Sequence, residues 1–134
     1  MQDAIETILA DYETWAVVGC SADRGRDSHR IAGLLQRRGK HVIPVNPQVK
    51  EVLGERAYPS LRHLPPGTRV DVVDIFRRAD QAGVHVDEAI AIGARAVWMQ
   101  LGVIDEAAAQ RARDAGLLVV MDRCPAIEWA SLAA

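Results

Sequence analysis

The segment at residues 19–28 holds the densest set of residues suited to binding an anion. It reads GCSADRGRDS and follows a short apolar run. Gly19 allows the backbone to turn tightly beside a ligand. Asp27 or Ser28 opens a segment with helical spacing, and the free N–H groups of a helix's first turn form an anion site. The pattern indicates a ligand-binding loop between a strand and a helix.

The charge around this loop points to the same chemistry. Between Arg24 and Lys40 the chain has six basic residues against one acid, although its formal net charge is −2. The basic residues near the end of the expected helix complement the helix dipole. Arg24 and Arg26 precede that helix, so the dipole does not account for them. The local excess of positive charge suits a polyphosphate ligand.

Two common nucleotide sites are disfavoured by what the loop lacks. The NAD fingerprint G-x-G-x-x-G is absent, because only Gly19 and the displaced Gly25 are present. The second apolar run ends in Asn46-Pro47, where an NAD site has an Asp or Glu for the ribose 2′-OH. The P-loop pattern G-x-x-x-x-G-K-[ST] is absent too, which excludes a P-loop NTPase.

The two cysteines, Cys20 and Cys124, follow the first and the fifth apolar run. They are too few for a disulfide scaffold or a four-thiolate zinc site, and no metal-ligand spacing occurs. A thiol at a helix N-terminus or beside Arg123 would be acidified and reactive, whereas a buried thiol would be inert. The four histidines show no triad order with a serine or cysteine, so we expect no catalytic residues.

The elements that position these residues alternate between two patterns. Short runs rich in β-branched residues predict five buried strands, at 15–18, 41–45, 70–75, 96–99 and 117–121. Helical spacing occurs between them, at 28–38, 84–93 and 105–115, with a glycine ending each segment. The crossover at 47–69 is broken by turns around a short helix at most. The pattern predicts an α/β fold: a doubly wound parallel sheet of five strands, ordered 3-2-1-4-5, with helices on both faces.

Length and composition limit the class of protein. The 134 residues fit one domain, 1–134, whose first 14 residues hold a helix packed outside the sheet. The slightly acidic balance gives no general attraction to nucleic acid, and no apolar run of about 18 residues could span a membrane. The N-terminus has no basic region before an apolar stretch, so a cytoplasmic protein is expected.

Seven separate motifs resemble the stand-alone CoA-binding domain family, over about residues 15–128. They are VVG at 17–19, IPVNP at 43–47, YPSL at 58–61, VDVVDIFR at 70–77, AIAIGA at 89–94, WMQLGV at 98–103 and VVMDRCP at 119–125. That family is similar in fold to the CoA-binding domains of the succinyl-CoA synthetase α subunit and of ADP-forming acyl-CoA synthetases. The resemblance implies a Rossmann-like module that binds coenzyme A or acyl-CoA, and the lack of metal-ligand spacing leads us to expect no metal.

The resemblance also implies where the ligand lies. The loop after the first strand approaches the CoA diphosphate, the ends of the next three strands border the cleft, and the segment after the fifth closes its mouth. The expected cofactor-binding residues are Gly19, Cys20, Ser21, Arg24, Arg26, Ser28, Asn46, Pro47, Phe76, Arg77, Gln100, Gly102, Arg123 and Cys124.

The function predicted from these features is CoA binding without catalysis of its own. The related synthetases use a phosphorylated histidine on a separate domain, for which this sequence has no counterpart. A partner acyltransferase or synthetase is expected to use the bound CoA. The competing hypothesis is an NAD(P)-dependent oxidoreductase or a thiol-redox enzyme using Cys20 or Cys124. A structural interaction domain that binds no cofactor is the third.

Overall fold

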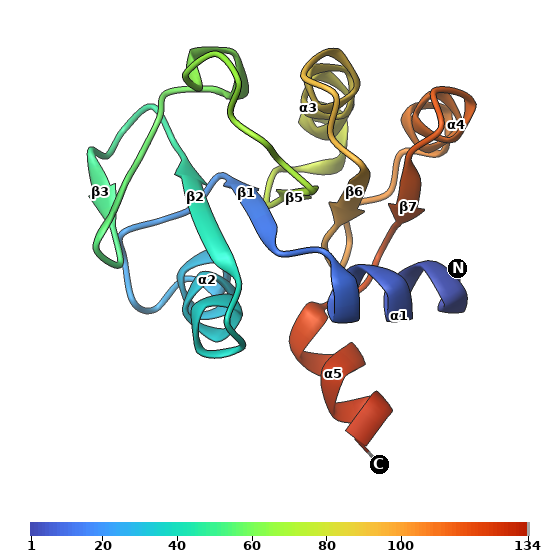
Figure 1. The fold of residues 1–134 in the computed structure, drawn as a ribbon, viewed down its shortest axis with the longest axis horizontal. Helices are drawn as coiled ribbons and strands as arrows, with labels where there is room; N and C mark the ends of the chain where they lie inside the picture. Colours follow the sequence, from blue (N-terminus) through green and yellow to red (C-terminus); the bar gives the residue numbers. More distant parts are fainter. Residues whose placement is uncertain (134) are drawn as a thin grey trace.

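Five parallel strands form the central sheet of the protein, which a computed structural model describes over residues 1–133. The strands of this sheet are β2 (His41–Val45), β1 (Thr14–Val18), β5 (Val72–Ile75), β6 (Ala96–Met99) and β7 (Leu118–Val120), in that order. A small antiparallel pair, β3 (Glu51–Val52) and β4 (Glu55–Arg56), lies beside β2 (Figure 1). The helices are α1 (Gln2–Asp11), α2 (Asp27–Arg37), the 3-10 turn η1 (Leu61–His63), α3 (Ala79–Ala91), α4 (Glu106–Asp114) and α5 (Pro125–Ala133).

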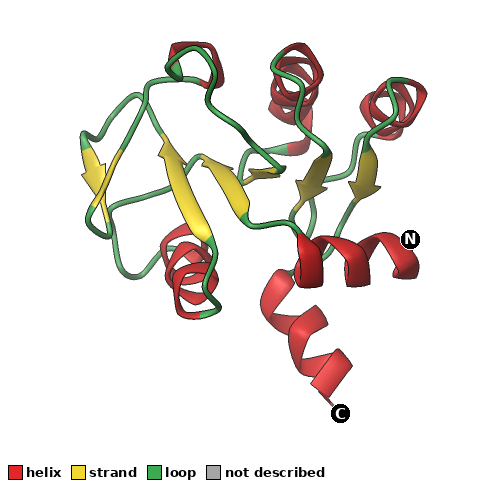
Figure 2. Cartoon of the chain, viewed as in Figure 1, coloured by secondary structure: helices red, strands yellow, loops and turns green. Residues whose placement is uncertain are grey.

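Helices cover both faces of the sheet. Figure 2 shows α1, α2 and α5 on one face and η1, α3 and α4 on the other. Right-handed crossovers explain which helices lie on which face. The connection from β1 to β2 runs toward one edge of the sheet and places α2 on one face, whereas the connections from β2 through β5 and β6 to β7 run toward the other edge and place η1, α3 and α4 on the opposite face. The predicted α/β fold, with five parallel strands between helical layers, is confirmed.

The predicted strand order, 3-2-1-4-5, needs correction. Numbered along the chain, the five strands of the sheet stand in the order 2-1-3-4-5, because β5 pairs with β1 rather than with β2. Both orders produce the same alternation of strands and helices, so the periodicity of the sequence does not distinguish them. The correction moves the reversal of strand order, where ligands bind in such sheets, to the gap between β1 and β5.

Pro44 is the residue in the sequence that indicates β2 as an edge strand, and so the observed order of the strands. It lies within β2 opposite Val17 of β1, and its carbonyl faces outward to accept the N–H of Tyr58 at 3.0 Å. Because proline has no N–H, it is confined to edge strands or to the ends of strands. In the order 3-2-1-4-5, β2 would be flanked on both sides and would lack one ladder bond at Pro44.

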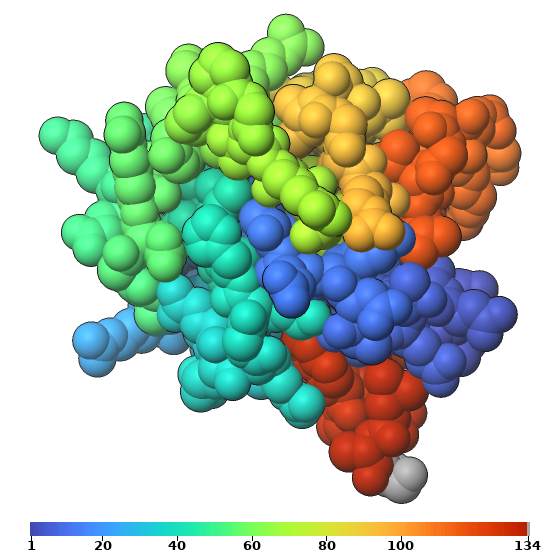
Figure 3. Space-filling view, in the orientation of Figure 1, coloured from blue at the N-terminus to red at the C-terminus, as the bar shows by residue number. Residues whose placement is uncertain are grey.

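Two helices differ from the sequence prediction. α3 begins at Ala79, earlier than the predicted start at residue 84, and α5 at Pro125–Ala133 was not predicted at all. Its first residue is a proline, a common helix start, but its composition is almost uniformly apolar and gives weak helical periodicity. In Figure 3 α5, in red, projects from the body of the molecule. Among residues 1–133, no helix has the length and apolar composition that a membrane span requires.

The core divides into two apolar clusters, one on each face of the sheet. Alternate residues of β1 contribute to each, with Trp15 and Val17 facing α1, α2 and α5. The Trp15 ring lies 5.7 Å from that of Trp98 and 6.5 Å from that of Trp129, measured between centroids. These indoles join the sheet to α5, and aromatic pairs at such distances add to the free energy of burial.

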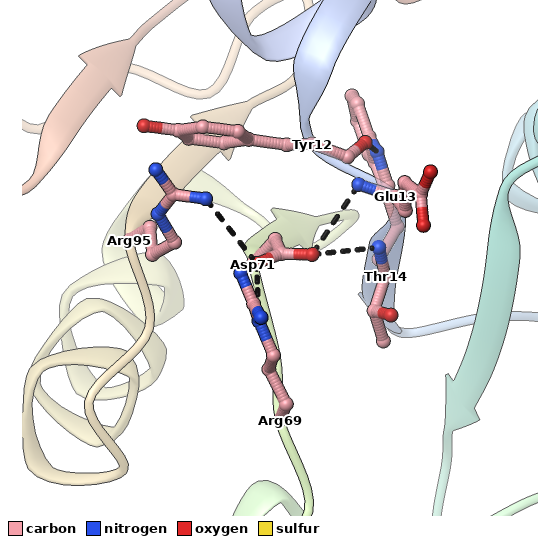
Figure 4. Close-up of polar contacts among 7 residues, drawn as sticks. Tyr12, Glu13, Thr14, Arg69, Asp71 and Arg95 are labelled. Carbon is pink, nitrogen blue, oxygen red and sulfur yellow. Dashed lines mark hydrogen bonds and ion pairs between the residues drawn. The ribbon is translucent and has the colours of Figure 1, made fainter.

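A buried carboxylate ties together the amino-terminal ends of the strands. Asp71 is 4% exposed and accepts the backbone N–H groups of Thr14 at 3.0 Å and Glu13 at 3.3 Å. Arg69 donates to it at 3.1 Å, and the Arg95 guanidinium lies 3.8 Å away (Figure 4). Burial acts to raise the Asp71 pKa, but these hydrogen bonds and the Arg69 charge outweigh it, so the pKa lies below its ordinary value.

The opposite ends of β1 and β5 approach each other closely at Gly19. This residue has φ of +81°, and a Cβ placed on it would overlap the carbonyl oxygen of Phe76 and lie 3.3 Å from the carbonyl carbon. Only glycine meets both conditions without strain. The two strand ends can therefore adjoin only because residue 19 has no side chain.

We predict that Gly19→Ala destabilises the protein more than Gly39→Ala does. Gly39 also has φ of +81°, but nothing lies within 4 Å of a Cβ placed there, so it isolates the backbone cost of about 1–2 kcal/mol. Gly19→Ala adds the overlap with Phe76 and should exceed that cost by more than ~1 kcal/mol. Urea unfolding monitored by circular dichroism measures both, and equal losses would contradict the prediction.

A second prediction concerns Asp71. Asp71→Asn should lower the free energy of unfolding at pH 7 by about 1–3 kcal/mol, because the hydrogen bonds lose their ionic acceptor. Since the folded-state pKa is lowered, this stabilisation is present above the unfolded carboxyl's ordinary pKa of 3.8 and disappears as the pH falls through the folded value. The unfolding free energies of the wild type and Asp71→Asn should therefore differ more at pH 7 than at pH 3.

Asp80→Asn is the matched control for this comparison. Asp80 pairs with Arg78 at 3.4 Å, but both side chains are more than 70% exposed, at 73% and 74%. Its replacement should change the unfolding free energy by less than ~0.5 kcal/mol at either pH. If Asp71→Asn behaves like this control at pH 7, the Asp71 contacts do not hold the strand ends together.

Candidate functional site

The loop after β1 is folded by its own side chains. Ser28, in the first turn of α2, accepts the N–H of Ser21 at 3.0 Å, and Ser21 in turn accepts the N–H of Asp23 at 3.0 Å. Asp23 accepts the N–H of Gly25 at 2.8 Å. These contacts hold residues 19–28 beside the amino-terminal end of α2, where the sequence predicts an anion site.

Two adjoining cavities lie at the carboxyl ends of the strands. The smaller, of about 340 Å³, is polar and is lined by Gly19, Ser21, Arg26, Asp27, Ser28 and Phe76. The larger, of about 790 Å³, is lined by Asp27, Arg30, Ile31, Leu34, Arg37, Phe76, Arg77, Arg78, Gln100, Leu101, Gly102, Val103, Cys124 and Ala126. Asp27 and Phe76 line both, and we call the two together the cleft.

The structure brings most of the predicted site residues to this cleft. Those lining it are Gly19, Ser21, Arg26, Ser28, Phe76, Arg77, Gln100, Gly102 and Cys124. The other five do not line it: Cys20 is fully buried, Arg24 is exposed in the loop, and the lining does not include Asn46, Pro47 or Arg123. The convergence follows from the β1–β5 pairing, which sets Phe76 and Arg77 next to the loop.

Two of the residues outside the lining shape the loops that border the cleft. Asn46 donates from Nδ2 to the carbonyl oxygen of Cys20 at 2.9 Å and accepts the N–H of Gln48 at 2.8 Å. Arg123 offers its carbonyl oxygen to Trp98 Nε1 at 3.0 Å, which ties the segment after β7 to β6. These residues position the loops after β1 and β7.

The sequence did not predict the part of the lining that α2 supplies beyond its first turn. Arg30, Leu34 and Arg37 of this helix, together with Arg78, Leu101, Val103 and Ala126, also line the larger cavity. Ile31 and Leu34 line the cleft and also pack with the buried core cluster, so the apolar face of α2 is divided between the two, according to how the helix sits on the sheet.

The cleft is lined by several arginines, some engaged by neighbouring groups and others without a carboxylate partner. Arg30 is engaged by Asp27 and by the carbonyl oxygen of Gly25 at 3.0 Å, and Arg77 donates to Gln81 at 2.6 Å. Arg26 and Arg37, both exposed, have no carboxylate within ion-pair distance among residues 1–133. Arg26 is the residue before the first turn of α2, where the positive pole of the helix dipole adds to the attraction of its guanidinium for anions, whereas Arg37 is the last residue of the helix and acts through its own charge alone.

A buried polar cluster lies beneath the cleft. Asp74 of β5 is 0% exposed, and Gln100 Nε2 donates to its Oδ1. Burial raises the Asp74 pKa to about 8, although the Gln100 hydrogen bond acts to lower it. Burial, and secondarily the Asp74 charge, raises the pKa of the Cys20 thiol to about 12. Cys20 is therefore an inert thiol at neutral pH, in contrast to Cys124, which is partly exposed in the cleft.

One family matches most of this chain. Residues 13–130 match the family described as "CoA binding domain". The uncharacterized protein YneT of Bacillus subtilis is 36% identical over 120 residues, covering 90% of this chain and 87% of YneT. A hypothetical protein of Pyrococcus horikoshii OT3 has a similar structure, with a TM-score of 0.92 and 35% identity, and the match covers all of this chain and 93% of that one.

A larger enzyme contains a domain of the same fold. The dinucleotide-forming acetyl-coenzyme A synthetase 1 of Candidatus Korarchaeum cryptofilum matches with a TM-score of 0.74 and 24% identity. The match covers 87% of this chain but 27% of the synthetase chain, so the fold corresponds to a portion of that enzyme. With a family match across residues 13–130 and a relative above one-third identity over most of its length, this chain belongs to the CoA binding domain family.

Proposed function

We propose that the cleft binds coenzyme A or acyl-CoA and that the protein catalyses no reaction by itself. The observation that carries this proposal is the polar cavity around Gly19, Ser21, Arg26 and Ser28. Three features border this cavity: the bare backbone at Gly19, the start of α2 and the unpaired guanidinium of Arg26. The proposal assigns the CoA diphosphate to this cavity.

The larger cavity fits the rest of the ligand. CoA combines phosphates, including a ribose 3′-phosphate, with a pantetheine arm that is largely apolar apart from two amides. The larger cavity offers Arg30, Arg37, Arg77 and Arg78 around an apolar wall that includes Leu34 and Val103. We assign the remaining phosphate to these arginines and the arm to the apolar wall, since ligand sites typically combine an apolar lining with a few placed polar groups.

The NAD(P)-dependent alternative has less support. An NAD site uses an acidic residue after the second strand for the ribose hydroxyls. Here Asn46 follows β2, and its side-chain amide is taken up by the Cys20 carbonyl and the Gln48 N–H. A positive cleft without such an acid suits the CoA phosphates better.

The proposal includes a partner that uses the bound CoA. The Korarchaeum protein that shares this fold is an acetyl-coenzyme A synthetase, and this chain matches 27% of its length. We therefore propose that the chain carries CoA or acyl-CoA for a separate synthetase or acyltransferase. This assignment rests on the shared fold and on the cleft.

We predict that CoA raises the melting temperature and that Arg26→Ala weakens CoA binding about tenfold, because a charge-assisted hydrogen bond to phosphate is lost. Arg24→Ala is the matched control, since Arg24 lies in the same loop but outside the cleft lining, and should change the Kd by less than about threefold. Calorimetric titration with CoA gives both values. A melting temperature that responds to NADH and not to CoA would reject the proposal.

A further prediction separates the two cysteines. Cys20 is buried with a raised pKa, whereas Cys124 borders the cleft proposed for the CoA thiol. Oxidised CoA, the CoA disulfide, should therefore form a mixed disulfide at Cys124: its thiolate attacks one sulfur, and the second CoA leaves as a thiolate. Intact-mass spectrometry should detect one adduct in the wild type and in Cys20→Ser and none in Cys124→Ser. An adduct on Cys124→Ser would show that the thiol positions are wrongly assigned.

A further inference from the structure

Asp74 is a carboxyl group in a position where burial destabilises the fold. It is the third residue of β5, opposite Val17 of β1 and Trp98 of β6, and it faces the layer of α1, α2 and α5 with those two apolar side chains. The side chain is 0% exposed. Carboxyl groups are almost never fully buried without full hydrogen bonding, so a packing role alone would favour an apolar residue here.

The hydrogen bonding of Asp74 is incomplete. Its Oδ1 accepts from Gln100 Nε2, whereas its Oδ2 has no partner and is the sole such enclosed side-chain polar atom in residues 1–133. Burial raises the Asp74 pKa to about 8. A costly, half-satisfied group directly below a ligand cleft is typical of residues retained for function rather than for stability.

The contact of Asp74 with Gln100 fixes the direction of an amide. Gln100 follows β6, is 6% exposed and lines the larger cavity. In its ionised form Asp74 can only accept hydrogen bonds, so it holds Nε2 and leaves the amide oxygen Oε1 as the free end of Gln100. Oε1 accepts no hydrogen bond from residues 1–133, and it is not among their enclosed unpaired atoms. The cleft wall therefore offers an acceptor at this point, and it would offer a donor if the amide were reversed.

We propose that Asp74 is a positioning residue that orients Gln100 so that its Oε1 accepts an N–H from an amide of the pantetheine arm. This inference rests on the proposed function and deepens it. The neighbouring lining of Gln100 in sequence, Leu101 and Val103, is apolar, as the arm requires between its amides. Phosphate oxygens offer no donor and would be repelled by Oε1, so the contact selects the arm rather than the phosphates.

Two ligands that differ by the pantetheine arm and the phosphate attached to it provide the test. Calorimetric titrations at pH 9, where Asp74 is ionised, use CoA and adenosine 3′,5′-bisphosphate, which keeps the adenosine, the 3′-phosphate and one 5′-phosphate. Gln100→Leu should raise the Kd for CoA about tenfold and leave that for the bisphosphate within about twofold. Asp74→Val should weaken CoA binding similarly while keeping or raising the melting temperature, because it removes an unsatisfied buried carboxyl. A residue with only a structural role would not combine these opposite effects.

A double variant shows whether Asp74 acts through Gln100. Asp74→Val combined with Gln100→Leu should bind CoA no more weakly than Gln100→Leu alone. If Asp74→Val fails to fold, Asp74→Asn replaces it and should weaken CoA binding by about threefold, because an asparagine accepts either orientation of the Gln100 amide.

The outcomes separate this inference from the proposed function. Wild-type protein that binds neither ligand would overturn both. Equal weakening of the two ligands by Gln100→Leu would place the contact on the adenosine and overturn the inference while leaving CoA binding intact. Additive effects in the double variant, or unchanged CoA affinity in the Asp74 variants, would also overturn it.

Discussion

The absence of a side chain at Gly19 is the constraint on which the rest of the site depends. Because a Cβ there would meet the carbonyl of Phe76, β1 and β5 can end side by side only with glycine at this position. Their loops then leave in opposite directions, the loop 19–28 toward α2 and the segment after Phe76 toward α3. The gap between these loops is the cleft, so one backbone contact sets its position and its floor.

Two aspartates of one short segment show how the two edges of the sheet differ. Asp71, at the amino-terminal edge, is surrounded by two backbone N–H groups and two arginines, and its pKa is lowered. Asp74 has a single donor, and its pKa is raised to about 8. The first arrangement stabilises the ionised form and joins the strand ends. The second leaves a carboxyl unsatisfied beneath the cleft, at a cost in stability that the core itself does not require.

The sequence predicted the class of fold and most of the cleft, because these depend on local patterns. Buried strands, glycine-ended helices and polar strand ends are each encoded within about ten residues. The order of the strands depends on a long-range choice that periodicity does not record, and the one local trace of it was Pro44. The separation of Arg24 from Arg26 and of Cys20 from Cys124 depends on how the loops fold, which side-chain contacts such as Ser28 to Ser21 decide.

The role of each arginine in this chain depends on its position in the structure. Three arginines stack on aromatic rings: Arg38 on Trp129 at 4.9 Å, Arg56 on Tyr58 at 5.1 Å and Arg95 on Tyr12 at 4.1 Å. Their planar guanidinium groups contribute packing contacts in addition to positive charge. Arg26 and Arg37 lie at the two ends of α2 beside the cleft and have no carboxylate partner among residues 1–133. The net charge of −2 averages over both groups. The field that an anionic ligand meets is set by the second group, because unpaired charges lining a cleft act on a ligand more strongly than neutralised or distant ones.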